Sequence, residues 1–286
     1  MMDSMTAQRP LLETRKLGKS FGGLSAVQDI DFTVPPGQIV SVIGPNGAGK
    51  STFFNLITGL YKPSTGKVFL DGQDITGYPP DRVLRQGIAR TFQNIRLFND
   101  MTIGENVLVG YHTRLRSNVI TDVLKPPGTR AEERRGRERA RELIATFAPN
   151  LSRRMDQLVR NLAYADRRYV EIARALASQP KLILLDEPTV GMNPAETVQA
   201  IDHIGHIRDL GVGVILIEHK LNVVMNLSSH VTVLDYGQKI AEGTPAQIQE
   251  DPRVIEAYPR AARGKNACWS LTTSTRTMVP FKCSRV

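Results

Sequence analysis

Continuous apolar runs alternate along the chain with segments of helical spacing. Three runs are apolar at nearly every position, which is typical of strands covered on both faces; they lie at 38–43, 182–185 and 212–217. Helical spacing follows each run after a short connection, over 52–60, 195–210 and 220–227. Strands that alternate with helices in this way predict a parallel sheet covered by helices, and therefore an α/β fold.

Shorter strands and a separate helical region complete this pattern. Strands are expected at 27–34 and 67–70, and a hairpin at 231–234 and 239–241. The middle of the chain predicts a helix at 101–111, an apolar segment at 118–127 that ends in proline, and a charged amphipathic helix at 130–147. Leu143, Ile144 and Phe147 share one face of that helix. The helical middle is therefore expected to be an insertion into the sheet domain.

Composition excludes several classes of protein. Hydrophobic residues make up 41% of the 286 residues and charged residues 23%, a balance that supports a folded core. The apolar runs are far shorter than the ~20 residues that cross a bilayer as a helix. Residues 1–10 form an N-terminal extension without the apolar stretch of a secretory signal. We therefore expect a soluble protein that stays in the cytoplasm.

Charge is concentrated at the C-terminus. Residues 257–286 hold six basic and no acidic residues, so removing them lowers the net charge from +9 to +3. A nucleic-acid partner would require a basic face on the folded domain, and none is predicted. The same segment contains Trp269 and both cysteines, so a disulfide framework and a cysteine metal cluster are excluded from the rest. Residues 259–286 are expected to be a basic, disordered tail.

A glycine-rich loop follows the first apolar strand and precedes a helix, which is the context of a phosphate-binding loop, here called the P-loop. It matches G-x-x-x-x-G-K-[ST] and comprises Gly44, Pro45, Asn46, Gly47, Ala48, Gly49, Lys50 and Ser51, with Thr52 next to it. Its backbone amides and the helix N-terminus would surround phosphate oxygens. Lys50 would reach the β- and γ-phosphates, and the hydroxyl of Ser51 would bind Mg²⁺.

Two carboxylates stand at the end of the apolar strand 182–185. A P-loop needs a carboxylate on a neighbouring strand for its magnesium ion, and Asp186 has that position. Glu187 follows directly, where it would polarise a water that attacks the phosphate. The sequence therefore predicts a site that binds and hydrolyses a nucleoside triphosphate.

These motifs, with others in the same order, resemble the ATP-binding cassette (ABC) ATPases. Phe21 matches the aromatic residue that stacks on adenine in that family. Gln93 matches the glutamine that contacts Mg²⁺ and the membrane partner, and His219 matches the histidine that contacts the γ-phosphate. Residues 191–194 match the family's D-loop, with Asn193 in place of the usual aspartate. The resemblance implies catalytic roles for Glu187, His219 and Gln93, and Mg²⁺ binding by Ser51, Gln93 and Asp186.

The resemblance also implies an architecture. It covers residues 11–258 and implies a P-loop NTPase core, an antiparallel β subdomain and an inserted helical subdomain at about 95–178.

The family's signature loop, LSGGQ, is altered in this chain. It falls on Leu162, Ala163, Tyr164, Ala165 and Asp166. In the family this loop contacts the γ-phosphate held by the opposite subunit. Ala163 lacks the serine hydroxyl, Ala165 adds a methyl group, and Asp166 adds a negative charge near the phosphate. These departures predict that the loop binds the nucleotide of the opposite subunit more weakly than the usual LSGGQ loop does.

One branch of the family is the most similar. The segments 90–98, 101–106, 191–194 and 251–258 resemble the larger ATPase paralogue of branched-chain amino-acid importers. This resemblance implies ATP and Mg²⁺ as ligands, two integral-membrane permease subunits as partners, and no nucleic acid. It also implies a head-to-tail dimer with a paralogous ATPase or a second copy, and indirect action of a periplasmic or extracellular substrate-binding protein. The expected location is the cytoplasmic face of the inner (plasma) membrane, as a peripheral subunit.

Two other functions remain as alternatives. One is a soluble ABC protein of translation or DNA repair, although the chain has one cassette and no sustained heptads. The other is a nucleotide-dependent interaction module that does not hydrolyse ATP, which the altered signature loop favours and Glu187 and His219 oppose. The transporter subunit is the preferred interpretation.

Overall fold

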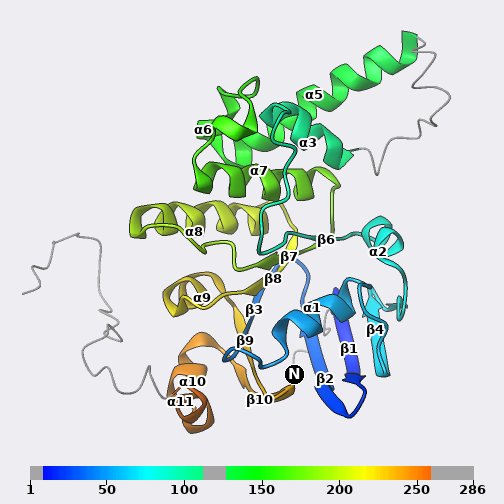
Figure 1. Cartoon of the computed structure of the whole chain (residues 1–286), viewed down its shortest axis with the longest axis vertical. Helices are drawn as coiled ribbons and strands as arrows, with labels where there is room; N and C mark the ends of the chain where they lie inside the picture. Colours follow the sequence, from blue (N-terminus) through cyan, green and yellow to red (C-terminus); the bar gives the residue numbers. More distant parts are fainter. Residues whose placement is uncertain (1–8, 112–126, 259–286) are drawn as a thin grey trace, which may run out of the picture.

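A computed structural model describes residues 9–111 and 127–258 and arranges them as two sheets beneath a group of helices (Figure 1). Residues 1–8 of the predicted extension 1–10, residues 118–126 of the predicted apolar segment 118–127, and the whole predicted tail 259–286 lie outside the described residues. The other predicted elements lie within the described residues.

The larger sheet contains all three of the continuous apolar runs. Its strand order is β10-β9-β3-β8-β7-β6, and every pair is parallel except β10 with β9. These strands are β3 (Ile39–Ile43), β6 (Ile88–Arg90), β7 (Leu182–Asp186), β8 (Gly213–Ile217), β9 (His230–Asp235) and β10 (Gln238–Gly243). The predicted parallel α/β sheet is therefore confirmed.

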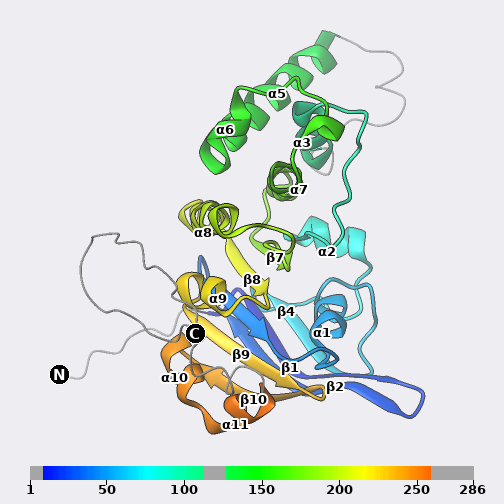
Figure 2. The same cartoon turned by 60° about the vertical axis from the view of Figure 1, so that its left-hand side comes forward.

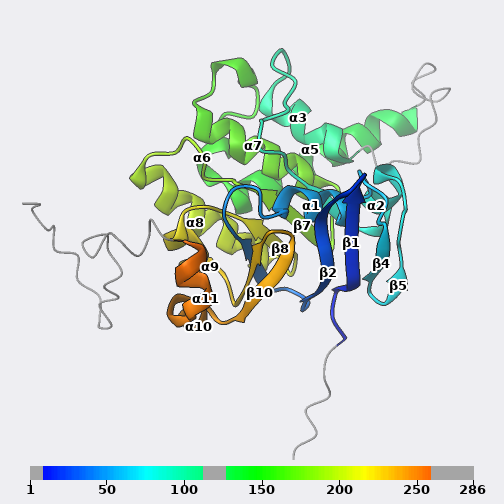
Figure 3. The same cartoon turned by 60° about the horizontal axis from the view of Figure 1, so that its bottom comes forward.

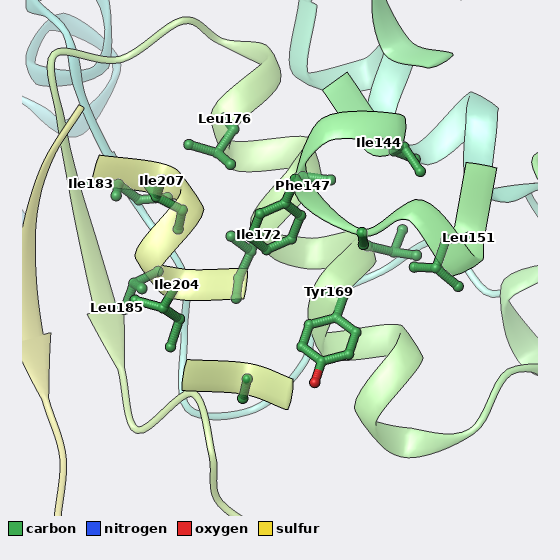
Figure 4. Packing of buried hydrophobic residues seen from close by; sticks show 14 of the residues in the cluster. Ile144, Phe147, Leu151, Tyr169, Ile172, Leu176, Ile183, Leu185, Ile204 and Ile207 are labelled. Carbon is green, nitrogen blue, oxygen red and sulfur yellow. The ribbon is translucent and has the colours of Figure 1, made fainter. Parts of the chain in front are cut away.

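Both faces of this sheet are buried, which explains why its central strands have no polar alternation. The helices that pack on it are α1 (Lys50–Ile57), α7 (Tyr164–Ala177), α8 (Pro194–Asp209) and α9 (Leu221–Leu227). In β7, Leu182 and Leu184 belong to a core shared with α1 and the smaller sheet. Ile183 and Leu185 belong to a core shared with α7 and α8 (Figure 4), the two helices that Figure 2 shows above β7 and β8. Burial on two sides fixes the strand ends that carry the candidate site.

The smaller sheet is antiparallel, in the order β2-β1-β4-β5 (Figure 3). Its strands are β1 (Leu12–Phe21), β2 (Leu24–Val34), β4 (Thr65–Leu70) and β5 (Gln73–Asp74). The apolar pattern did not reveal β1, because register shifts between Thr14 and Leu17 and beyond break its two-residue alternation. Phe32 of β2 packs edge-on against Phe53 of α1, with ring centroids 5.3 Å apart, and so joins this sheet to the P-loop helix.

The helical group lies over the other side of the larger sheet (Figure 1). It consists of α3 (Ile103–Tyr111), α5 (Pro127–Phe147), α6 (Pro149–Ser152), a 3₁₀ turn (Val159–Asn161) and α7. The predicted amphipathic helix is α5, and its residues Ile144 and Phe147 are fully buried. No helix among residues 9–111 and 127–258 has the length and apolar composition needed to cross a membrane. The subdomain limits at about 95 and 178 stay a prediction.

Several short helices were not predicted, because six or seven residues are too few to show an apolar period of helical spacing. They are α2 (Pro80–Gln86), α10 (Pro245–Glu250) and α11 (Pro252–Ala257). Thr244 and Gln247 form a capping box at the start of α10, and Asp251 caps α11. Ile248 and Val254 then pack against β9 and β10 in a third apolar core.

Phe147 is expected to be a major source of stability for the helical group. Its buried ring packs against Tyr169 of α7 (Figure 4) and also contacts the ring of His203 on α8. Phe147→Ala should lower the free energy of unfolding by about 3–5 kcal/mol, measured by chemical denaturation. Val198→Ala, at a position on α8 that is 59% exposed, is the control and should change it by less than about 0.5 kcal/mol. Equal effects of the two substitutions would contradict the described packing.

Candidate nucleotide-binding site

The P-loop connects the carboxyl end of β3 to the first residue of α1. The helix begins at Lys50, two residues earlier than predicted, with Gly49 as its N-cap in the left-handed region at φ 93°. A Cβ atom on Gly49 would lie 2.5 Å from the carbonyl oxygen of Ala26, so only glycine fits there. Because the first amides of a helix have no intrahelical partner, those that follow Gly49 are available to an anion.

The side chain of Lys50 closes this loop. Its Nζ donates hydrogen bonds to the carbonyl oxygens of Gly44 (2.6 Å) and Pro45 (2.8 Å). Burial lowers the pKa of Lys50, whereas the nearby charges of Glu187 and Asp186 raise it. A buried ammonium therefore lies at the centre of the loop, next to both predicted carboxylates.

An open cleft runs along the loop and brings most predicted site residues together. Its lining includes Asn46, Gly47, Ala48, Gly49, Lys50, Ser51, Thr52, Gln93, Glu187 and His219. Phe21 does not line this cleft, since its ring packs edge-on against Tyr61 with centroids 5.3 Å apart. It pairs across the hairpin with Leu24, which does line the cleft. The predicted adenine-stacking residue therefore lies beside the rim of the cleft.

Glu187 is held by the two other predicted catalytic residues. The Nε2 atom of His219 lies 2.7 Å from its Oε1 atom, and Gln93 donates a hydrogen bond of 3.1 Å to its Oε2 atom. The backbone of Glu187 is left-handed at φ 48°, a conformation that costs a non-glycine residue roughly 1–2 kcal/mol. Its amide donates to the carbonyl of Ile217 on β8, which helps to hold this conformation. The carboxylate is thus fixed in position at the edge of the cleft.

Asp186 is paired with an arginine that was not predicted to belong to the site. Arg90, the last residue of β6, donates a hydrogen bond of 2.8 Å to Oδ2 of Asp186. The two side chains are only 9% and 10% exposed. The sequence places Arg90 directly after the apolar residues Ile88 and Ala89, which is a weak indication of a buried arginine. It does not show the partner, because Asp186 lies on another strand of the sheet.

Two further buried charges, Arg168 and Glu218, hold the loops around the cleft. Arg168 of α7 is fully buried and donates to the carbonyl oxygens of Phe92 and Gln93, both at 2.6 Å. Glu218 is buried and accepts hydrogen bonds from the backbone amides of Thr189 and His219. Both residues therefore support the backbone around catalytic candidates without lining the cleft themselves.

The signature loop lies at the start of α7, and none of its five residues lines the cleft of this chain's own P-loop. Leu162 is buried, Ala163 is the N-cap of α7, and Tyr164 is its first residue. Ala165 is also buried, so its methyl group belongs to the helical core. Asp166 forms an ion pair of 2.8 Å with Arg154, which balances the negative charge that the sequence analysis emphasised.

The oxygen atoms available at the cleft fit a magnesium ion. Magnesium prefers hard oxygen ligands, and in nucleotide sites it takes few of them from the protein. Ser51 and Gln93 line the cleft, whereas Asp186 is buried outside its lining, close enough to Lys50 for its charge to act on that ammonium. Among the described residues no three histidine, cysteine, aspartate or glutamate side chains gather as a metal centre made by protein alone.

Comparison with known proteins establishes the family. The model of the ABC transporter family matches residues 27–190, which is more than half of the chain. The chain belongs to the ABC transporter family. A second model, described as branched-chain amino acid ATP-binding cassette transporter, matches residues 238–258. This ABC cassette is therefore an ATPase, and the predicted family and reaction class are confirmed.

Individual relatives are similar in sequence to this chain over most of its length. It is 43% identical over 251 residues to the high-affinity branched-chain amino acid transport ATP-binding protein BraF of Pseudomonas aeruginosa. It is 41% identical over 251 residues to LivG of Escherichia coli K12, a protein of the same description. Both alignments cover 87% of this chain and 98% of the relative.

Solved structures confirm the predicted fold class. A nucleotide-free ATP-binding cassette from an ABC transporter superposes with a TM-score of 0.75 at 33% identity, over 87% of this chain and 99% of that chain. An ATP-binding cassette of an ABC transporter in its ADP conformation superposes with a TM-score of 0.75 at 31% identity, over 88% of this chain and 99% of that chain.

The conformation of Gly49 predicts a specific sensitivity of the cassette. Gly49→Ala should weaken ATP binding by about tenfold or more, because the new methyl group collides with the carbonyl of Ala26 and displaces the start of α1. Equilibrium binding of a fluorescent ATP analogue measures the effect. Gly23→Ala is the matched control, since no atom lies within 4 Å of the added Cβ there. Unchanged affinity in Gly49→Ala would contradict the described loop.

Proposed function

We propose that this chain is the ATP-hydrolysing subunit of an importer for branched-chain or related amino acids. The observation that carries the proposal is the convergence of Lys50, Gln93, Glu187 and His219 on one cleft. The amino-acid specificity is supported by the match of residues 238–258 and by the names of the relatives BraF and LivG. The solute itself would bind to other subunits, so this chain supplies the energy of transport.

The residues of the cleft divide into binding and catalytic roles. The backbone amides of 44–52 and the ammonium of Lys50 would bind the phosphates of ATP. Phe21 lies beside the rim of the cleft, and its proposed role is to stack on an adenine that extends past that rim. Glu187 accepts a proton from the attacking water, and His219 orients its carboxylate through the 2.7 Å contact. Gln93 donates to the second oxygen of Glu187, so both carboxylate oxygens of the base are held by side chains.

Ser51, Gln93 and Asp186 would hold Mg²⁺ beside the phosphates. When bound, the ion neutralises negative charge that develops on the phosphate oxygens. The chain itself contributes the oxygen ligands and keeps Asp186 buried at the end of β7.

Transport requires partners that complete the site. Residues 162–166 lie outside this chain's own cleft, which supports their use on the nucleotide of an opposite subunit, either a paralogue or a second copy. The assembly would contain two permease subunits in the membrane, place this chain on the cytoplasmic face, and respond indirectly to a substrate-binding protein. No role for nucleic acid is proposed.

Glu187→Gln tests the reaction. The change keeps the shape of the side chain but removes the base, so ATP turnover should fall by about 10²-fold or more while ATP binding is retained. Glu256→Gln, at an exposed position on α11, is the control and should keep full turnover. Turnover that survives in Glu187→Gln would assign the base elsewhere. Wild-type protein that binds but never hydrolyses ATP, alone or with its partners, would favour the non-hydrolysing interaction module.

The transported solute is tested in the assembled system. Proteoliposomes that contain this chain, its permease subunits and the cognate binding protein should accumulate leucine only when ATP is enclosed. ATP hydrolysis that responds to no branched-chain amino acid, together with absent leucine uptake, would contradict the amino-acid part of the proposal. Recovery of the chain with ribosomes or DNA, and not with membrane subunits, would contradict the transporter role.

A further inference from the structure

The side chain of Arg90 connects three parts of the nucleotide site. One terminal nitrogen donates to Oδ2 of Asp186 at 2.8 Å, and the other donates to Oδ1 of Asn55 on α1 at 2.6 Å. Its guanidinium also lies near the rings of Phe54 and Phe92, 5.5 and 5.2 Å from their centroids. Arg90 is therefore fixed between β7, the P-loop helix and the loop that carries Gln93.

The charge of Arg90 matters because the cleft must accept a polyanion. Asp186 and Glu187 lie close enough to Lys50 for their charges to raise the pKa of its ammonium. Without Arg90, the two carboxylates would outnumber the positive charges provided by Lys50 alone. An unpaired carboxylate that is largely buried acts on nearby phosphates through a weakly screened field, so it would oppose nucleotide binding.

We propose that Arg90 is a positioning residue that neutralises Asp186 and thereby allows the P-loop to bind nucleotide before a divalent cation is present. The inference rests on the proposed function, since it assumes that the cleft binds ATP or ADP. Arg90 acts through Asp186 and its fixed position beside α1, and it does not line the cleft itself. A divalent cation held by Ser51, Gln93 and Asp186 would supply part of the same neutralisation, so nucleotide binding would depend less on Arg90 in its presence.

Arginine suits this role better than lysine does. Its planar fork reaches Asp186 and Asn55 with separate nitrogens, so the charge is held in one place and also orients the carboxylate. A lysine would supply the charge from a single ammonium and could satisfy these partners only in part. The conservative variant therefore separates charge from orientation.

The test compares the affinity for a fluorescent ADP analogue in EDTA with its affinity in excess Mg²⁺. In Arg90→Met the affinity in EDTA should fall by about tenfold or more, and Mg²⁺ should restore most of it. Arg90→Lys should fall between wild type and Arg90→Met in EDTA. Arg85→Met is the matched control, because that arginine pairs with Asp81 at the exposed surface of α2, and it should keep the wild-type ratio.

The double variant Arg90→Met/Asp186→Asn isolates the charge. It should recover the affinity in EDTA, because no unpaired carboxylate remains to oppose the phosphates. An unchanged ratio of the two affinities in Arg90→Met, or a loss in EDTA that persists in the double variant, would overturn the inference and leave Arg90 with a packing role. Wild-type protein that binds the analogue in neither condition would instead overturn the proposed function on which the inference rests.

Discussion

The buried ammonium of Lys50 donates to the carbonyl oxygens of Gly44 and Pro45, and this contact gives the P-loop its closed shape. A charged amine is costly to bury unless it is paired, and here the carboxylates of Asp186 and Glu187 lie nearby. The same contact places the start of α1 at the edge of the cleft. The closed shape of the loop and the position of the first residue of α1 therefore depend on one side chain.

The parallel sheet supplies the other half of the site. The segments that follow β6, β7 and β8 leave the same edge of the sheet and carry Gln93, Glu187 and His219 to the cleft. Their contacts with one another fix a carboxylate in a strained backbone conformation. Two fully packed apolar faces hold the strand ends in register, so that the strain is supported by the core.

The local sequence pattern was sufficient to predict the strands 182–185 and 212–217, because burial on both faces makes them apolar at nearly every position. It was also sufficient to predict the P-loop, because all residues of that loop are adjacent in the sequence. It was insufficient for β1, whose register shifts remove the alternation. It was also insufficient for Arg90, whose partner Asp186 lies 96 residues away, and for Arg168, whose partners lie 75 and 76 residues away. Buried charges are paired by topology, and topology cannot be read from a local pattern.

The most direct test of this account is the affinity of Lys50→Ala for ATP, measured by calorimetric titration. The account predicts a loss of about tenfold or more, because one charged contact with the phosphates and the closure of the loop disappear together. Lys67→Ala is the control, since that lysine pairs with Asp74 at the surface of β4 and should leave the affinity unchanged. A folded Lys50→Ala variant that binds ATP as tightly as wild type would contradict the account.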